Sequence, residues 1–191
     1  MAIADLVGLI LAAGNSSRFG KQNKLLHSTG NNPPLGLLCA QKIQKVILRT
    51  LVVCRSNDIK FQTLCALNNI PYTANKRAEM GMSTSIVTGV EQTPDAKGWI
   101  IFLADMPYIQ TQTIRQVLSL IDTSRGKIIV PTYNGLWGHP VAFSNKFKQD
   151  LLALKGDVGA RSIIQQNRGD VLFCEVNDEA ILLDIDCKKR V

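Results

Sequence analysis

The sequence lacks a long apolar run, a Cys-x-x-Cys pair, a low-complexity tract and a convincing internal repeat. No apolar run reaches the ~18 residues that span a bilayer, so we expect no membrane partner. The odd number of cysteines, five, argues against both a disulfide framework and a structural zinc site. The first residues also lack the basic region and cleavage site of a secretory signal. We therefore expect a cytoplasmic protein with reduced thiols.

Aromatic side chains do not alternate with basic ones in any stretch, which argues against nucleic acid as a partner. The chain does have a net charge of +7, which suits a protein that handles anions. Its 191 residues, 46% of them apolar and 19% charged, are typical of a globular protein with a substantial core. We expect residues 1–191 to form a single domain.

The stretch Leu9–Lys24 joins an apolar run, typical of a strand buried on both faces, to a Gly/Ser loop that carries cations. Gly14 and Gly20 let the backbone approach an anion closely. Arg18 can bind two phosphate oxygens, and Lys24 can act as a point charge. The loop is not a P-loop, because five residues separate its glycines and no Ser or Thr follows the Gly-Lys pair. It predicts phosphate binding, with an ordinary strand-to-helix turn as the alternative.

Strand-like apolar runs alternate with segments of helical periodicity along most of the chain. This alternation predicts an α/β fold of three layers, Rossmann-like, with a mostly parallel central sheet. We expect antiparallel pieces from residues 139–143 and from the last strands. The expected strands are 6–12, 50–54, 70–73, 99–103, 127–131, 139–143, 171–176 and 181–183. The expected helices are 35–47, 57–68, 82–92, 111–121, 144–154 and one that opens within 155–161 and runs to about 166.

Two stretches place polar groups at the ends of expected elements. Gly81 and Ser83 lie where a helix begins, and free amides and hydroxyls there favour anions or polar base edges. A plain helix cap is the alternative. Asp105 follows the strand 99–103, and ligands of open α/β sheets bind beyond the carboxyl ends of strands. Its carboxylate suits Mg²⁺, with a cap for the next helix as the alternative.

Three stretches of the C-terminal third carry further candidates. His139 lies in Gly-His-Pro before a short apolar strand, where it could also bond only to backbone. Asp157 is a natural cap for the helix that follows it, and Arg161 can face a phosphate or make a surface pair. In an extended strand, Asp184 and Asp186 would lie on one face, where they repel unless a cation or water separates them.

These motifs together resemble the nucleotidyltransferases with a glycosyltransferase-A-like fold. Within them, the resemblance is to the molybdenum cofactor cytidylyltransferases and other MobA-like molybdopterin nucleotidyltransferases. It rests on Leu-Ala-Ala-Gly-x-Ser-x-Arg-x-Gly-x-x-x-Lys, Gly-x-Ser-x-Ser, Asp-Met-Pro, Gly-His-Pro and Gly-Asp-x-Gly-Ala-Arg, and it runs from about residue 7 to 186. After Asp186 this chain has Cys-Lys-Lys-Arg-Val where the family usually has Thr-Pro-Glu-Asp.

The resemblance implies a role for each motif. The first loop would wrap the triphosphate, and the helix start at Gly81 and Ser83 would meet base and ribose. Asp105 and Asp186 would hold Mg²⁺. His139 and Arg161 would lie on the acceptor side. The implied nucleotide-binding residues are Leu11, Ala12, Ala13, Gly14, Ser16, Ser17, Arg18, Lys24, Gly81, Ser83 and Asp105, and the implied catalytic residues are Arg18, Lys24 and Asp105.

Three functions remain open at this point. The first is a Mg²⁺-dependent nucleotidyltransferase that, by resemblance, moves CMP from CTP onto molybdopterin; Leu-Ala-Ala-Gly resembles the cytidylyl branch and Leu-Ala-Gly-Gly is typical of the guanylyl branch. The second is a non-catalytic nucleotide- or pterin-binding maturation factor for a molybdoenzyme partner. The third is a GTP-using enzyme or a sugar-phosphate nucleotidyltransferase, because a fold does not fix the acceptor.

Overall fold

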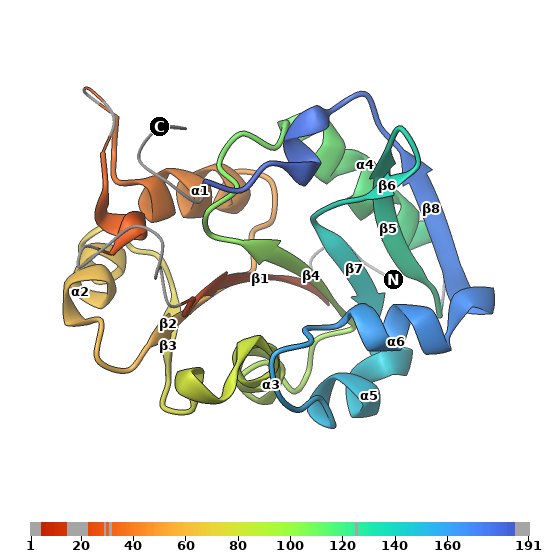
Figure 1. The fold of residues 1–191 in the computed structure, drawn as a ribbon, viewed down its shortest axis with the longest axis horizontal. Coiled ribbons are helices and arrows are strands. Elements are labelled where there is room, and N and C mark those ends of the chain that lie inside the picture. The colour runs from red at the N-terminus through yellow and green to blue at the C-terminus, as the bar shows by residue number, and fades with distance from the viewer. Residues whose placement is uncertain (1–4, 15–22, 29, 31, 125, 186–191) are drawn as a thin grey trace.

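The computed structural model of the protein describes residues 5–14, 23–28, 30, 32–124 and 126–185. An eight-stranded sheet lies between two layers of helices (Figure 1). The strands are β1 (Leu6–Ala12), β2 (Thr50–Arg55), β3 (Tyr72–Asn75), β4 (Gly98–Leu103), β5 (Ile128–Tyr133), β6 (Leu136–Trp137), β7 (Val141–Ser144) and β8 (Val171–Glu175). The α-helices are α1 (Leu35–Gln44), α2 (Ile59–Leu67), α3 (Met82–Glu91), α4 (Thr111–Thr123), α5 (Lys148–Leu152) and α6 (Arg161–Gln166).

The sheet is mostly parallel in its first half and mixed in its second. Its order is β3-β2-β1-β4-β7-β5-β6, and β8 pairs with β5. β1 is parallel to β2 and β4, whereas β7 runs antiparallel to β4 and β5. The predicted α/β fold with a mostly parallel central sheet is therefore confirmed, as are antiparallel pieces around β7.

β1 is buried along its whole length because both of its faces are covered. Ile10 packs into the core beneath α1, α2 and α4, and Leu9 packs into the core beneath α3, α5 and α6. Figure 1 shows these two helical layers on opposite faces of the sheet. This two-sided burial explains why the β1 sequence is a continuous apolar run.

Two sequence-based expectations about the C-terminal strands are wrong. β8 is parallel to β5, because the chain crosses back through α5 and α6 before it rejoins the sheet. Residues 181–183 form no strand, because the 3₁₀ helix η7 (Glu179–Leu182) includes the first two of them and Leu183 is its C-cap. Asp178 explains this helix: its carboxylate accepts from the Ala180 N–H and also from the Gln110 N–H and Thr113 hydroxyl of the α4 start.

The described part of the chain also bears on two expectations about composition. It contains no helix that is long and apolar enough to cross a membrane. Its cysteines, Cys39, Cys54, Cys65 and Cys174, are free thiols in the interior. They serve there as small apolar core residues.

Candidate active site

A cavity of about 510 Å³ opens at the carboxyl ends of β1 and β4. The register of these parallel strands places Leu11 opposite Leu103, and the Ala104 N–H donates to the Leu11 carbonyl at 3.1 Å. The segments that follow both strands therefore meet at one edge of the sheet. Of the residues predicted to bind nucleotide, those that line the cavity are Leu11, Ala12, Ala13, Gly14, Lys24, Gly81 and Asp105. Ser16, Ser17, Arg18 and Asp186 lie outside the described residues.

An ion pair joins the two predicted catalytic residues of this cavity that the structure describes. The Lys24 Nζ lies 2.5 Å from the Asp105 Oδ2, with side-chain exposures of 11% and 17%. Lys24 begins the 3₁₀ helix η3 (Lys24–Leu26), whose start is capped by the Asn23 side chain. Asn23 in turn donates to the carboxylate of Asp58, so the loop end that carries Lys24 is tied to the start of α2.

The backbone around Asp105 is held from several sides. Its carbonyl accepts from the Ile185 N–H at 3.0 Å. The Lys42 ammonium, on α1, donates to the carbonyls of Pro107 and Ile109 in the loop that follows. These bonds hold the backbone that carries the Asp105 carboxylate in place.

Cys39 lies buried beneath the same loop. Its thiol donates to the Leu103 carbonyl at 3.6 Å. Burial, as the largest cause, raises the pKa of the Cys39 thiol to about 12, and the charge of Asp105 adds to that rise. Cys39 is therefore a neutral packing residue rather than a nucleophile.

The cavity wall is rich in carboxylates. Glu79, Asp157 and Asp184 line it together with Asp105. Within the described ranges, no group of three His, Cys, Asp or Glu side chains could hold a metal ion. Protein-bound Mg²⁺ usually takes one or two carboxylates and completes its shell with water and substrate phosphates. The donor set of Asp105, with Asp184 nearby in the same wall, fits a cation of that kind.

The start of α3 is built by a loop from far along the sequence. Gly81 has φ of 107°, and a Cβ there would lie 2.5 Å from the Gly156 carbonyl oxygen, so only glycine fits. The Met82 N–H donates to the Asp157 Oδ1 at 2.9 Å. The expectation that Asp157 caps its own following helix is wrong, because α6 has Ala160 at its N-cap and Asp157 instead caps α3.

The structure separates the two serines of this helix start. Ser83 is fully buried, its hydroxyl has no hydrogen-bond partner among the described residues, and it is not in the cavity wall. Ser85 lines the cavity, and the Asn75 side chain donates to its hydroxyl oxygen at 3.1 Å. Helical spacing could have indicated this, because Ser85 follows Gly81 by four residues and such pairs share a helix face.

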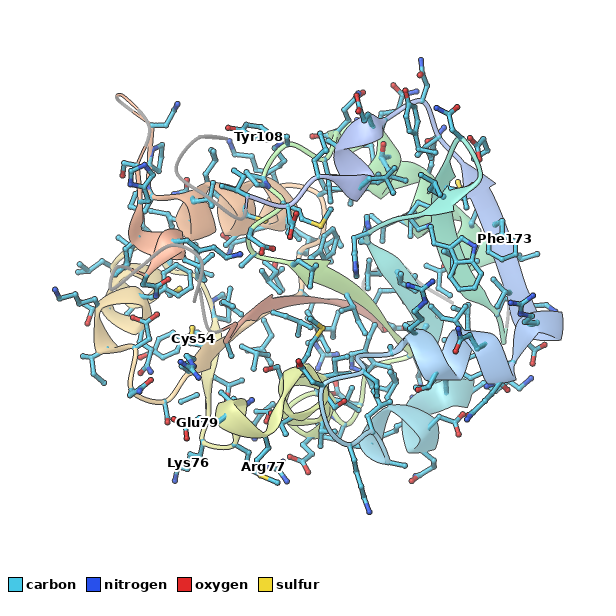
Figure 2. The ribbon with its side chains drawn as sticks, in the orientation of Figure 1. Cys54, Lys76, Arg77, Glu79, Tyr108 and Phe173 are labelled. Carbon is cyan, nitrogen blue, oxygen red and sulfur yellow. The ribbon has the colours of Figure 1, made fainter. Side chains whose placement is uncertain are left out.

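Two cations, Lys76 and Arg77, lie close to the cavity in sequence. Figure 2 shows both beside Glu79, at the turn that joins β3 to α3. Arg77 pairs with Glu91 at 3.4 Å on an exposed surface. Of Lys76, Arg77 and Glu79, the acidic residue is the one that lines the cavity.

A second, mainly apolar cavity of about 170 Å³ adjoins the first. The two share Leu11, Met82 and Leu103 as a common wall. The second cavity brings together His139 and Arg161, the two residues predicted to lie on the acceptor side. Its remaining wall contains Ile86, Ile101, Val130, Trp137, Val141, Phe143 and Ile164.

His139 and Arg161 differ in their surroundings. Burial lowers the pKa of the His139 imidazole, against a smaller opposing effect of a hydrogen bond to Ile101 and of the Asp105 charge. Its Nδ1 has no hydrogen-bond partner among the described residues. The Arg161 guanidinium lies over the Trp137 ring at 5.7 Å, and that ring packs at 5.4 Å against Phe173 of β8, which Figure 2 labels.

Residues 8–171 match the MobA-like NTP transferase domain. This range includes Lys24, Asp105, His139 and Arg161 of the two cavities. The chain belongs to the MobA-like NTP transferase family. The resemblance drawn from its motifs is thereby confirmed. The family and the fold are those of nucleotidyltransferases.

Two curated proteins are similar in sequence to this MobA-like chain. It is 30% identical over 196 residues to the Purine catabolism protein PucB of Bacillus subtilis (strain 168), covering 95% of this chain and 91% of PucB. It is 25% identical over 138 residues to the Molybdenum cofactor biosynthesis bifunctional protein of Synechocystis sp. (strain ATCC 27184 / PCC 6803 / Kazusa). That match covers 72% of this chain and 37% of the Synechocystis protein.

Solved structures share the MobA-like fold at low sequence identity. Rv0371c from Mycobacterium tuberculosis H37Rv superposes with a TM-score of 0.85 and 23% identity, covering 99% of this chain and 96% of that one. A manganese complex of Rv0371C superposes with a TM-score of 0.75 and 20% identity, covering 90% and 88%. A CMP:2-keto-3-deoxy-manno-octonic acid synthetase complexed with CTP gives 0.75 and 11%, covering 97% and 94%.

Proposed function

We propose that the protein transfers CMP from CTP onto a phosphorylated small-molecule acceptor, molybdopterin or a related cofactor. An acceptor phosphate oxygen attacks the α-phosphorus of CTP. The bond between the α-phosphorus and the oxygen that bridges to the β-phosphorus breaks, and pyrophosphate leaves. The reaction needs positioning and charge neutralisation more than a protein nucleophile.

The observation that carries the proposal is the pair of adjoining cavities. The larger one has the polar lining that a triphosphate with its cation needs, including Lys24 and Asp105. The smaller one offers apolar walls and the Trp137 ring to a flat heterocycle, with Arg161 at 5.7 Å from that ring for a phosphate. The two cavities share Leu11, Met82 and Leu103, so two bound substrates would lie next to each other.

Each described residue has a distinct task under this proposal. The Lys24 ammonium binds triphosphate oxygens, and the hydroxyl of Ser85 donates to the nucleotide. Asp105, with Asp184 or Asp186, would hold Mg²⁺. When bound, Mg²⁺ neutralises triphosphate charge and orients the α-phosphorus for in-line attack. The neutral imidazole of His139 hydrogen-bonds the acceptor.

Three relatives support the finer parts of the proposal. The Synechocystis relative is named for molybdenum cofactor biosynthesis, which supports molybdopterin as acceptor and a molybdoenzyme as the eventual recipient. The octonic acid synthetase was solved with CTP, which supports CTP as donor. Rv0371C was solved with manganese, which supports a divalent cation.

A thermal-shift series tests the donor and the cation together. The wild type is titrated with CTP, GTP, ATP and UTP, with and without Mg²⁺. A ligand at ~100-fold its dissociation constant stabilises the fold by about 2.7 kcal/mol, so we expect a clear rise in Tm with CTP and Mg²⁺. Asp105→Asn should abolish the Mg²⁺-dependent part. Asp170→Asn, which breaks ion pairs to Lys127 and Lys146 instead, is the matched control.

Each outcome has a defined meaning. A GTP-selective shift would replace CTP by GTP as donor, and no shift with any nucleotide would overturn the proposal. Pyrophosphate release in the presence of molybdopterin then tests transfer. CTP binding without release would favour the non-catalytic maturation factor.

A further inference from the structure

We infer that the Lys24–Asp105 ion pair is a placeholder for the divalent cation. The Lys24 ammonium pairs with the Asp105 carboxylate until nucleotide phosphates attract the ammonium away. The cation and the nucleotide therefore bind together rather than separately. The inference rests on the proposed metal role of Asp105. It concerns the state of the site before any ligand arrives.

The pair occupies one of the two oxygens of the carboxylate that a cation would use. The Lys24 ammonium donates a charge-assisted hydrogen bond to the Asp105 Oδ2. Both side chains are largely shielded from water, so their attraction is only weakly screened by salt. A divalent cation at Asp105 would meet a positive charge within a few ångströms, which opposes its binding by direct repulsion.

The described part of the cavity wall offers a cation few further ligands. No cluster of three metal-ligating side chains occurs in the part of the chain that the structure describes. Asp184 and Glu79 lie in the same wall, yet they do not complete such a cluster with Asp105. From the described residues, a cation without nucleotide therefore has few protein oxygens to replace its water, and substrate phosphates would supply others.

The two partners of the pair belong to different parts of the fold. Lys24 belongs to η3 and Asp105 to the segment after β4, 81 residues away. A lysine ammonium is a mobile point charge on four methylene groups, so it can turn from a carboxylate to a nearby phosphate. The bonds from Ile185 and Lys42 keep the Asp105 backbone in place meanwhile.

Manganese binding without nucleotide tests the inference directly. Free Mn²⁺ is measured by electron paramagnetic resonance in titrations of the wild type, Lys24→Met, Lys24→Gln and Asp105→Asn. We expect both Lys24 variants to bind nucleotide-free Mn²⁺ at least about fivefold more tightly than the wild type, the lower end of typical coupling between sites. Asp105→Asn should lose this binding.

Lys146→Met is the matched control for the loss of one positive charge. Lys146 pairs with Asp170, which is not in the cavity wall, so its removal should leave Mn²⁺ affinity within twofold of the wild type. Thermal unfolding of every variant checks that it is folded. The use of two Lys24 substitutions keeps the test open if one of them fails to fold.

The outcomes separate this inference from the proposed function. If Asp105→Asn loses Mn²⁺ but both Lys24 variants bind it no better than the wild type, the placeholder role is overturned and the metal role of Asp105 stands. If Asp105→Asn binds Mn²⁺ like the wild type, the metal role itself fails, and the inference fails with it. If Lys146→Met increases Mn²⁺ affinity as much as Lys24→Met does, the increase comes from the change in net charge alone. That result would also overturn the placeholder role.

Discussion

At the scale of single residues, His139 illustrates how burial sets a protonation state. Burial lowers its pKa below the ordinary value of 6.5, so the folded protein keeps the imidazole neutral at a pH where the unfolded chain is protonated. The unfolded chain then binds more protons, and stability rises with pH through this window. Stability from this source is present above about pH 6.5 and is lost as pH falls below it.

We expect His139→Gln to reduce this pH dependence. Urea denaturation at pH 7.5 and pH 5 gives the free energy of unfolding of each variant, and the loss between the two should be smaller in His139→Gln than in the wild type. His27→Gln, at the chain's other histidine, is the control. Equal losses in His139→Gln and the wild type would contradict the assignment.

Arg18 carries a second residue-scale prediction that comes from sequence alone, because Arg18 lies outside the described residues. If its guanidinium stabilises charge on the triphosphate, Arg18→Ala should lower turnover at least about tenfold in a steady-state pyrophosphate assay. Arg49→Ala, which removes an exposed pair with Asp95, should leave turnover unchanged. Unchanged turnover in Arg18→Ala would remove its phosphate role.

At the scale of elements, the start of α3 depends on a residue 75 positions away. Asp157→Ala removes the oxygen that accepts the Met82 N–H, a loss that typically costs about 1 kcal/mol. We expect Tm to fall by roughly 2–4 °C in calorimetry, and nucleotide affinity to weaken, since both residues line the cavity. Asp157→Asn keeps an acceptor and should retain most of the stability; equal losses in the two variants would exclude the cap.

The sequence predicted where helices and strands lie better than it predicted which distant segments they contact. Strong apolar runs such as Leu6–Ala12 predicted strands, and the helix expected over 57–68 is α2. The direction of β8 was missed because it depends on the path of the chain through two helices, which no local pattern records. Asp157 was assigned to the nearest helix, because sequence patterns favour local caps over distant ones.

The residues of the candidate site also fall into those that the sequence predicted and those that it missed. Residues carried by a motif next to a buried strand, such as Gly14 and Asp105, were predicted and line the cavity. Ser85 and Glu79 were not singled out, because which side of a helix or turn faces the cavity is decided by packing. The wall between the two cavities could not be predicted at all, since it forms where segments around residues 11, 82 and 103 meet.

At the scale of the whole molecule, charge shapes the approach of ligands. The net charge of +7 favours the approach of an anion such as CTP, the proposed donor, even though the described part of the cavity wall carries several carboxylates. We expect the association rate of CTP in stopped-flow measurements to fall as ionic strength rises from about 0.01 M to 0.15 M, because the screening length shrinks from ~30 to ~8 Å. A rate that is independent of salt would exclude long-range attraction.

The wall of Leu11, Met82 and Leu103 between the cavities has a practical consequence. Under the proposed function, each substrate is recognised by its own set of side chains. Libraries restricted to Trp137, Val141 and Ile164 would therefore explore new acceptors while the donor site stays as it is. Laboratory evolution could start from this scaffold to attach cytidine nucleotides to synthetic phosphates.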